Sequence, residues 1–152
     1  MKIYNTYSRQ LEDFQPIEPG KVKMYVCGPT VYNYIHVGNA RSVVAFDLVR
    51  KYLEFRGFEV QYISNFTDVD DKIINGAKAA NMTTTDFSER YIAAFYEDTD
   101  ALNVKRASQN PKATEFIEAM IEFIQELVDK EFAYVSQGDV YFRVSKSKDY
   151  AK

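Results

Sequence analysis

One segment, residues 21–64, constrains the fold of this chain most strongly. Apolar and polar side chains alternate over residues 21–27, as is typical of a β-strand, and the breaker Gly28-Pro29-Thr30 follows directly. Residues 41–55 carry apolar side chains almost all round and predict a helix, and alternation resumes over residues 59–64. Strand, turn, helix and strand in this order predict a βαβ unit, so the expected fold class is α/β with a parallel sheet. Such units bind ligands at the carboxyl ends of their strands.

The predicted helix over residues 41–55 is expected to be largely buried. Its polar side chains form one narrow stripe, and Gly57 stands just beyond its end, where glycine favours helix termination. The stripe consists of Asp47, Arg50, Lys51 and Glu54.

The remainder of the chain predicts three more helices, a short strand and a hairpin. Helix starts are read from acidic and threonine N-caps, and the hairpin from a Gln-Gly-Asp turn between alternating segments. In chain order these elements are helices over residues 68–80 and from Thr83, a short strand over 102–105, an amphipathic helix over 112–130, and hairpin strands over 132–135 and 140–144.

Composition narrows the functional classes. The 152 residues are 46% hydrophobic, enough for a buried core, and the single cysteine cannot form a disulfide within the chain. No apolar run reaches the roughly 20 residues of a membrane span, so we expect a cytoplasmic protein without a membrane partner. Lys and Arg total 19 and Asp and Glu total 22, a net charge of −3. This balance provides no electrostatic footprint for nucleic acid within the chain.

The chemistry of the chain is concentrated in residues 27–41, between the first predicted strand and the helix. This stretch holds the only cysteine, Cys27, and the only histidine, His36. His36 and Asn39 stand on either side of Gly38 on the first helical turn, beside backbone N–H groups without intrahelical partners. With the positive end of the helix dipole they predict an anion site, where Gly38 lets a nucleotide approach the backbone. An imidazole and an amide donating to phosphate oxygens would stabilise charge during adenylation.

A short motif and two longer strings of residues resemble a known family. His36-Val37-Gly38-Asn39 resembles the His-Ile-Gly-His signature of class I aminoacyl-tRNA synthetases. Residues 24–32 and residues 65–73 are similar to cysteinyl-tRNA synthetases, and the similarity continues along the whole chain. Asn39 departs from the signature, which has a second histidine there, but its amide still donates a hydrogen bond.

The resemblance implies a more detailed fold. Residues 1–110 would form the N-terminal half of a Rossmann-type catalytic domain, the first half of its parallel sheet. Residues 111–152 would be the truncated start of the inserted connective region, a helix followed by a β-hairpin. By the same resemblance the chain is an N-terminal fragment of a synthetase, and the isolated fragment is expected to be inactive.

The resemblance also assigns roles to residues of the predicted site. The residues that would bind ATP, which arrives with Mg²⁺, are His36, Gly38 and Asn39, of which His36 and Asn39 would be catalytic. The residues that would line the amino-acid pocket are Gly28, Thr30 and Thr67.

The resemblance further implies that Cys27 is one of four zinc ligands, the other three being absent from this sequence. Zn²⁺ binds a thiolate better than a hydroxyl at neutral pH, so such a site would select cysteine over serine. Judged without the resemblance, a lone cysteine is more often a small buried hydrophobe.

The function that the resemblance implies is that of a cysteine–tRNA ligase. Such an enzyme activates cysteine with ATP to cysteinyl-adenylate and transfers it to tRNA(Cys), here as a cytoplasmic monomer. Two alternatives stay open: an ATP-dependent ligase that joins cysteine to an amino-sugar, and a non-catalytic nucleotide-binding module. Asp68, Asp70 and Asp71 are interpreted as helix-opening charges rather than a Mg²⁺ site. Residues 145–148 are interpreted as a solvated tail rather than the synthetases' lysine-serine loop.

Overall fold

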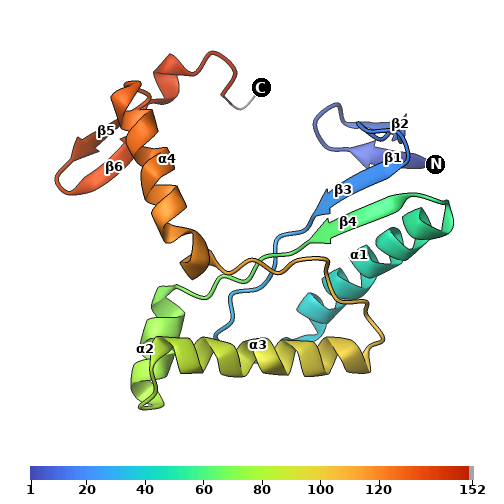
Figure 1. Ribbon diagram of the computed structural model, residues 1–152, viewed down its shortest axis with the longest axis horizontal. Coiled ribbons are helices and arrows are strands. Elements are labelled where there is room, and N and C mark those ends of the chain that lie inside the picture. Colours follow the sequence, from blue (N-terminus) through green and yellow to red (C-terminus); the bar gives the residue numbers. More distant parts are fainter. Residues whose placement is uncertain (151–152) are drawn as a thin grey trace. The chain divides into compact units, whose positions relative to one another are not determined.

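The computed structural model describes residues 1–150, and the chain forms two compact units, Met1–Pro111 and the segment from Lys112 onward. The first unit contains β1 (Lys2–Asn5), β2 (Gln10–Asp13), β3 (Lys21–Tyr25), α1 (Val37–Phe55), β4 (Glu59–Ile63), α2 (Asp71–Ala79) and α3 (Thr84–Ala101) (Figure 1). The second unit contains a 3-10 turn (Ala113–Phe116), α4 (Ile117–Asp129), β5 (Ala133–Ser136), β6 (Asp139–Phe142) and a second 3-10 turn (Val144–Lys146).

The predicted βαβ unit is present as β3, α1 and β4. The two strands pair in parallel over their whole length, from Lys21 opposite Glu59 to Tyr25 opposite Ile63. Their arrows point the same way in Figure 1, and α1 connects the end of one to the start of the other. This arrangement confirms the α/β class and brings the ends of both strands to one edge of the sheet.

Helix α1 begins at Val37, before the apolar segment 41–55, and His36 caps it, in agreement with the predicted place of His36 and Asn39 at the first helical turn. Its other end is closed as predicted by Gly57, which has a positive φ of 88°. The Gly57 N–H donates to the Glu54 carbonyl at 2.9 Å, and the Phe58 N–H donates to the Leu53 carbonyl at 3.1 Å. This pair of bonds is the Schellman motif, whose C′ position requires the left-handed conformation that glycine adopts without strain.

The polar stripe of α1 is partly buried, and the helix, which was expected to be largely buried, exposes much of its apolar surface. Asp47 and Arg50 are only 6% and 4% exposed, whereas Leu48 and Phe55 are 68% and 83% exposed. The stripe faces inward because it hydrogen-bonds a segment of backbone that has no strand partner there. The exposed apolar side chains lie on the other side of the helix.

The segment that meets the stripe is residues 103–107, where the predicted strand over 102–105 is wrong. The Lys105 N–H donates to the Asp47 carboxylate at 3.1 Å, and the Arg50 guanidinium donates to the Arg106 carbonyl at 2.7 Å. Side chains therefore satisfy backbone groups that a sheet neighbour would otherwise pair.

Parallel pairing with β4 begins only after this segment. The Ser108 N–H donates to the Tyr62 carbonyl at 2.7 Å, and the Ser64 N–H donates to the Gln109 carbonyl at 3.2 Å. Ile63 and Gln109 form a parallel bridge, so the segment around Gln109 lies beside the end of β4.

Two apolar clusters hold the first unit together. The smaller one joins β3, β4 and α1 through Val22, Val60 and Leu53. The larger one lies beneath the loops that follow the two strands and contacts α2 and α3, and it consists of Val31, Phe66, Ile73, Ala77, Phe87 and Ile92. Phe66 and Val31 are 1% and 2% exposed, so each strand-end loop is anchored by a buried side chain.

Helices α2 and α3 follow the predicted caps. Asp70 caps α2 by accepting from the Lys72 N–H at 2.8 Å, so the helix begins at Asp71 rather than at the predicted residue 68. Thr83 caps α3 by accepting from the Asp86 N–H at 3.0 Å, as expected. These caps satisfy N–H groups that have no partner inside the helix.

The antiparallel β1–β2 hairpin was not predicted. Its strands pair from Lys2 opposite Asp13 to Asn5 opposite Gln10, and Arg9 ends the turn at a positive φ of 58°. The four-residue connection contains neither glycine, proline nor Asn-Gly, which are the usual sequence signals of a hairpin.

In the second unit the predicted helix over 112–130 is divided into a 3-10 turn and α4. The predicted hairpin is present, with β5 and β6 paired antiparallel and Gln137 and Gly138 both at positive φ. Such a two-residue turn matches the twist of its strands. Among residues 1–150, no helix has the length and apolarity required to cross a bilayer.

Candidate functional site

The loops that follow β3 and β4 are joined to each other by backbone hydrogen bonds. The Val31 N–H donates to the Thr67 carbonyl at 3.1 Å, and the Thr67 N–H donates to the Pro29 carbonyl at 3.1 Å. Thr30 and Thr67 therefore form a parallel bridge beyond the ends of the strands. Two residues that the sequence assigned to one pocket are adjacent, although 37 positions separate them.

Asn65 joins the same two loops through its side chain. Its Oδ1 accepts from the Gly28 N–H at 3.0 Å and from the Tyr25 hydroxyl at 2.8 Å. Its Nδ2 donates to the Thr67 hydroxyl at 3.4 Å. Sequence reasoning placed Asn65 only inside a family string and missed this role, because an asparagine after a strand is also an ordinary turn residue.

Gly28 is required at its position by the backbone of the opposite loop. A Cβ on Gly28 would lie 1.7 Å from the carbonyl oxygen of Asn65, far inside van der Waals contact. Glycine therefore allows the two loops to touch without a side chain between them.

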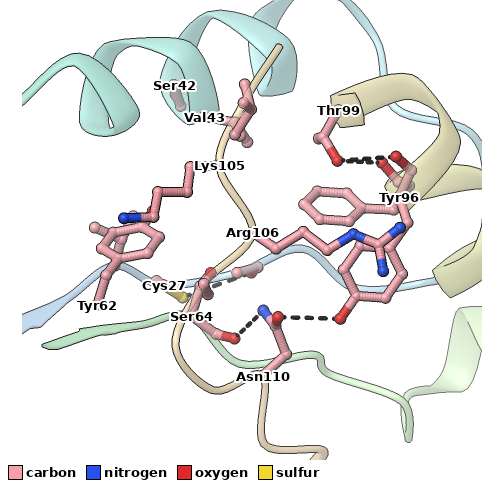
Figure 2. A pocket seen from close by; sticks show the side chains of 15 residues that line it. Cys27, Ser42, Val43, Tyr62, Ser64, Tyr96, Thr99, Lys105, Arg106 and Asn110 are labelled. Atoms are coloured by element: carbon pink, nitrogen blue, oxygen red, sulfur yellow. Dashed lines mark hydrogen bonds between the residues drawn. The ribbon is translucent and has the colours of Figure 1, made fainter. Parts of the chain in front are cut away.

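Gly28 lines a small hollow of about 60 Å³. Figure 2 shows Cys27 and Ser64 at its centre, with Tyr62 on one side and Arg106 against Tyr96 on the other. Burial raises the pKa of the Tyr62 hydroxyl above its usual value, so this wall stays neutral.

Asn110 closes the small hollow by bridging two walls. Its Nδ2 donates to the Ser64 carbonyl at 2.7 Å, and its Oδ1 accepts from the Tyr96 hydroxyl at 3.0 Å. The Arg106 guanidinium lies 4.4 Å from the centre of the Tyr96 ring, a cation–π contact. Cys27 itself is exposed and its thiol carries no disulfide.

Gly28 also lines a larger hollow, of about 460 Å³. Four predicted site residues line it: Gly28, Thr30, His36 and Asn39. Gly28 and Phe95 line both hollows, whereas Cys27 lines only the smaller one. Thr67 lines neither and is bonded to the loop that carries Thr30.

His36 and Asn39 are linked in a capping box at the start of α1. The His36 Nδ1 accepts from the Gly38 N–H at 2.9 Å, and the Asn39 Oδ1 accepts from the His36 N–H at 3.3 Å. The Gly38 N–H is thus already bonded, which corrects the expectation that this group is free for an anion. Each side chain uses an acceptor atom to cap the helix.

The capping box leaves donors for the larger hollow. Because Nδ1 of His36 is an acceptor, the proton of the neutral ring lies on Nε2, which has the geometry to donate elsewhere. Because Oδ1 of Asn39 is an acceptor, its Nδ2 amide retains two N–H donors. A site with an imidazole donor, an amide donor and a helix N-terminus favours an anionic group such as a phosphate.

Gly38 makes room for the ring of His36. A Cβ at this position would lie 2.6 Å from Cε1 of His36 and 3.0 Å from Nδ1. The glycine therefore permits the ring to fold back over the first turn. This space holds the His36 ring, whereas the sequence predicted that a nucleotide would approach the backbone there.

No cluster of candidate metal ligands surrounds Cys27 in the described part of the chain, residues 1–150. Zinc needs four ligands, and one thiol does not meet that requirement, so these residues alone do not fit the metal. Asp68 and Asp70 belong to the acidic run that was interpreted as helix-opening charges rather than a Mg²⁺ site. Asp70 caps α2, and Asp68 is buried.

Comparison with families and sequences of known proteins gives consistent matches. The model of the tRNA synthetases class I (C) catalytic domain matches residues 13–152. A cysteine–tRNA ligase of Lactococcus lactis subsp. cremoris (strain MG1363) is 88% identical over all 152 residues, and one of Streptococcus agalactiae serotype Ia is 62% identical. The chain spans 34% of the length of each of these curated relatives.

Solved structures resemble the fold at low sequence identity. A Mycobacterium tuberculosis methionyl-tRNA synthetase in complex with methionyl-adenylate aligns with a TM-score of 0.68 and 19% identity, over 75% of this chain and 23% of that chain. A ternary complex of Agrobacterium radiobacter K84 agnB2 LeuRS with tRNA and LeuAMS aligns with a TM-score of 0.64 and 20% identity, over 80% of this chain and 16% of that chain.

Proposed function

The chain belongs to the family of class I (C) tRNA synthetase catalytic domains, and on this premise we propose that it forms the part of a cysteine–tRNA ligase that binds ATP and cysteine. The observation that carries the proposal is the capping box of His36 and Asn39 at a hollow that also contains Gly28 and Thr30. The similarity to cysteine–tRNA ligases over all 152 residues supports the same substrate.

On the nucleotide side, His36 and Asn39 are the catalytic residues of the proposal. ATP, brought with Mg²⁺, lies with its phosphates in the larger hollow at the start of α1, beside the His36 ring for which Gly38 makes room. The His36 Nε2–H and the Asn39 amide donate to phosphate oxygens while a carboxylate oxygen of cysteine attacks the α-phosphorus and pyrophosphate leaves. Donors already oriented by the helix cap stabilise the developing charge without reorganisation.

On the amino-acid side, Gly28, Thr30 and Thr67 bind cysteine at the junction of the two strand-end loops. Backbone bonds between the loops fix Thr30 and Thr67, and the Asn65 side chain holds Gly28, so these polar groups need little ordering when the substrate binds. Groups that are held in place before binding suit a substrate that must present its carboxylate to the nucleotide.

Cys27 is the one zinc ligand that this chain contributes in the proposal, out of the four that the ion needs. The other ligands have to come from outside residues 1–150, because no cluster of ligands exists within that part of the chain. When bound, the metal supplies a preference for a thiol over a hydroxyl. Metal analysis of the longer protein tests this assignment: we expect zinc in the wild type and its loss in Cys27→Ser.

The remaining parts of the proposal concern partners and location. The acceptor is tRNA(Cys), and the enzyme acts as a monomer in the cytoplasm. The net charge of −3 agrees with a main tRNA contact outside this chain. Residues 1–110 are proposed as half of the nucleotide-binding catalytic domain and residues 111–152 as the beginning of the connective insertion.

The acceptor of activated cysteine tests the proposed function. The longer protein that carries this chain is incubated with ATP, labelled cysteine and either tRNA(Cys) or an amino-sugar. We expect label on tRNA alone, and activation without either acceptor as pyrophosphate exchange. Transfer to the amino-sugar would establish the alternative ligase, and nucleotide binding without activation would establish a non-catalytic module.

A further inference from the structure

We infer that Asn65 is a positioning residue, which holds Gly28 and the adjacent Cys27 in place for cysteine. The inference rests on the proposed function and extends it to a residue outside the predicted site. Asn65 uses both sides of its amide: Oδ1 accepts from the Gly28 N–H and the Tyr25 hydroxyl, and Nδ2 donates to the Thr67 hydroxyl. One side chain thus joins the end of β3, the loop that follows β3 and Thr67 in its own loop.

The hydrogen bonds along the loop explain why this side chain matters at Gly28. Upstream, the Val26 N–H donates to the Ile63 carbonyl at 3.0 Å, and downstream the Pro29 carbonyl accepts from Thr67. Between these two backbone bonds, the Gly28 N–H bonds to the Asn65 side chain. The loop is therefore held at Gly28 by an amide side chain and on either side by the backbone.

Direct contact between the loops transmits the position of Asn65 to both hollows. The carbonyl oxygen of Asn65 occupies the space of a Gly28 side chain, and Gly28 lines the hollow of Cys27 as well as the hollow of His36. A shift of Asn65 consequently displaces Gly28, a residue that lines both hollows.

The nucleotide side has anchors that do not depend on the Asn65 side chain. His36 and Asn39 are held by the helix cap that they form together, and Phe66, next to Asn65, is held by burial at 1% exposure. Loss of the Asn65 amide should therefore disturb cysteine binding more than ATP binding.

Kinetics of pyrophosphate exchange by the longer protein test this inference. We expect Asn65→Ala to raise the KM for cysteine about tenfold and to change the KM for ATP little. A tenfold change corresponds to the net contribution of one or two neutral hydrogen bonds. Asn65→Asp keeps the acceptors for Gly28 and Tyr25 and should restore most of the cysteine affinity. Asn5→Ala is the matched control, because Asn5 also uses both sides of its amide, in two hydrogen bonds, but in the β1–β2 hairpin.

Amide hydrogen exchange provides a readout that is independent of activity. The Gly28 N–H should exchange about tenfold faster in Asn65→Ala than in the wild type and remain protected in Asn65→Asp. Equal rises of both KM values, or unchanged Gly28 exchange, would overturn the positioning role while leaving the proposed function intact. If the wild-type protein showed no cysteine-dependent pyrophosphate exchange, the proposed function would be overturned instead, and the role of Asn65 in cysteine binding with it.

Discussion

At the scale of single residues, the imidazole of His36 uses its two nitrogens differently. Nδ1 accepts from the backbone N–H of Gly38 and so belongs to the fold, while Nε2 carries the proton that the proposed chemistry needs. Asn39 also uses the two ends of its amide differently: Oδ1 accepts from the His36 N–H, and the Nδ2 donors remain for a phosphate. An asparagine therefore suits this place, since it supplies an acceptor for the cap and donors for a phosphate.

Two substitutions of His36 should separate these roles. Asparagine is a good N-cap, so His36→Asn keeps α1 intact, whereas His36→Ala loses about 1 kcal/mol of helix stability. Both remove the Nε2–H donor, and we expect each to slow cysteine activation about 100- to 1,000-fold with little change in cysteine KM. Single-turnover adenylation and thermal unfolding of the longer protein measure the two effects. A normal rate in His36→Asn would show that Nε2 is not a phosphate donor.

At the scale of elements, α1 shows what the sequence could and could not predict. Its existence and its end at Gly57 follow from local signals, namely apolar density and a glycine that closes the helix. Its orientation does not, because Asp47 and Arg50 are buried only by virtue of a segment more than 50 residues later. Hydrophobic periodicity contains no information on such a partner.

The same distinction holds for the candidate site. Cys27 and His36 were identified because the only cysteine and the only histidine stand between a strand and a helix, and Thr30 because it matches the amino-acid pocket of the family that the chain resembles. The role of Asn65 could not be identified from the sequence, since it arises from the register between two loops. Asn65 and Gly28 form a unit only because β3 and β4 are parallel and end together.

The contact between α1 and the 103–107 segment should weaken in acid. The hydrogen bond from Lys105 lowers the pKa of the Glu54 carboxyl below its usual value, and Arg50 adds to this effect against the opposing effect of burial. A pKa that is lower in the folded than in the unfolded state stabilises the fold above the unfolded value, about 4.3, and this stability is lost as pH falls through the folded value.

Neutralising Glu54 tests this expectation. We expect Glu54→Gln to lower the urea midpoint at pH 7 and to make the midpoint fall less between pH 5 and pH 3 than it does in the wild type. Glu97→Gln, on α3, is the control for the removal of a carboxylate elsewhere. A wild-type acid dependence in Glu54→Gln would mean that the Lys105 contact does not contribute.

At the scale of the whole molecule, the chain forms two compact units and spans 34% of the length of its curated relatives. Within the first unit, two hollows lie beyond the ends of the parallel strands, and Gly28 lines both of them. The described residues offer one thiol and no metal cluster. Activation of cysteine is therefore expected from the longer protein, in which further ligands and phosphate contacts can complete this site.

Cysteine-dependent exchange of pyrophosphate into ATP tests this account most directly. It is measured with the longer protein and with the isolated 152-residue chain, using serine as the control amino acid. We predict exchange by the longer protein that depends on cysteine and stays near background with serine, and background exchange by the isolated chain with either. Comparable exchange by the isolated chain, or equal exchange with cysteine and serine, would contradict the account.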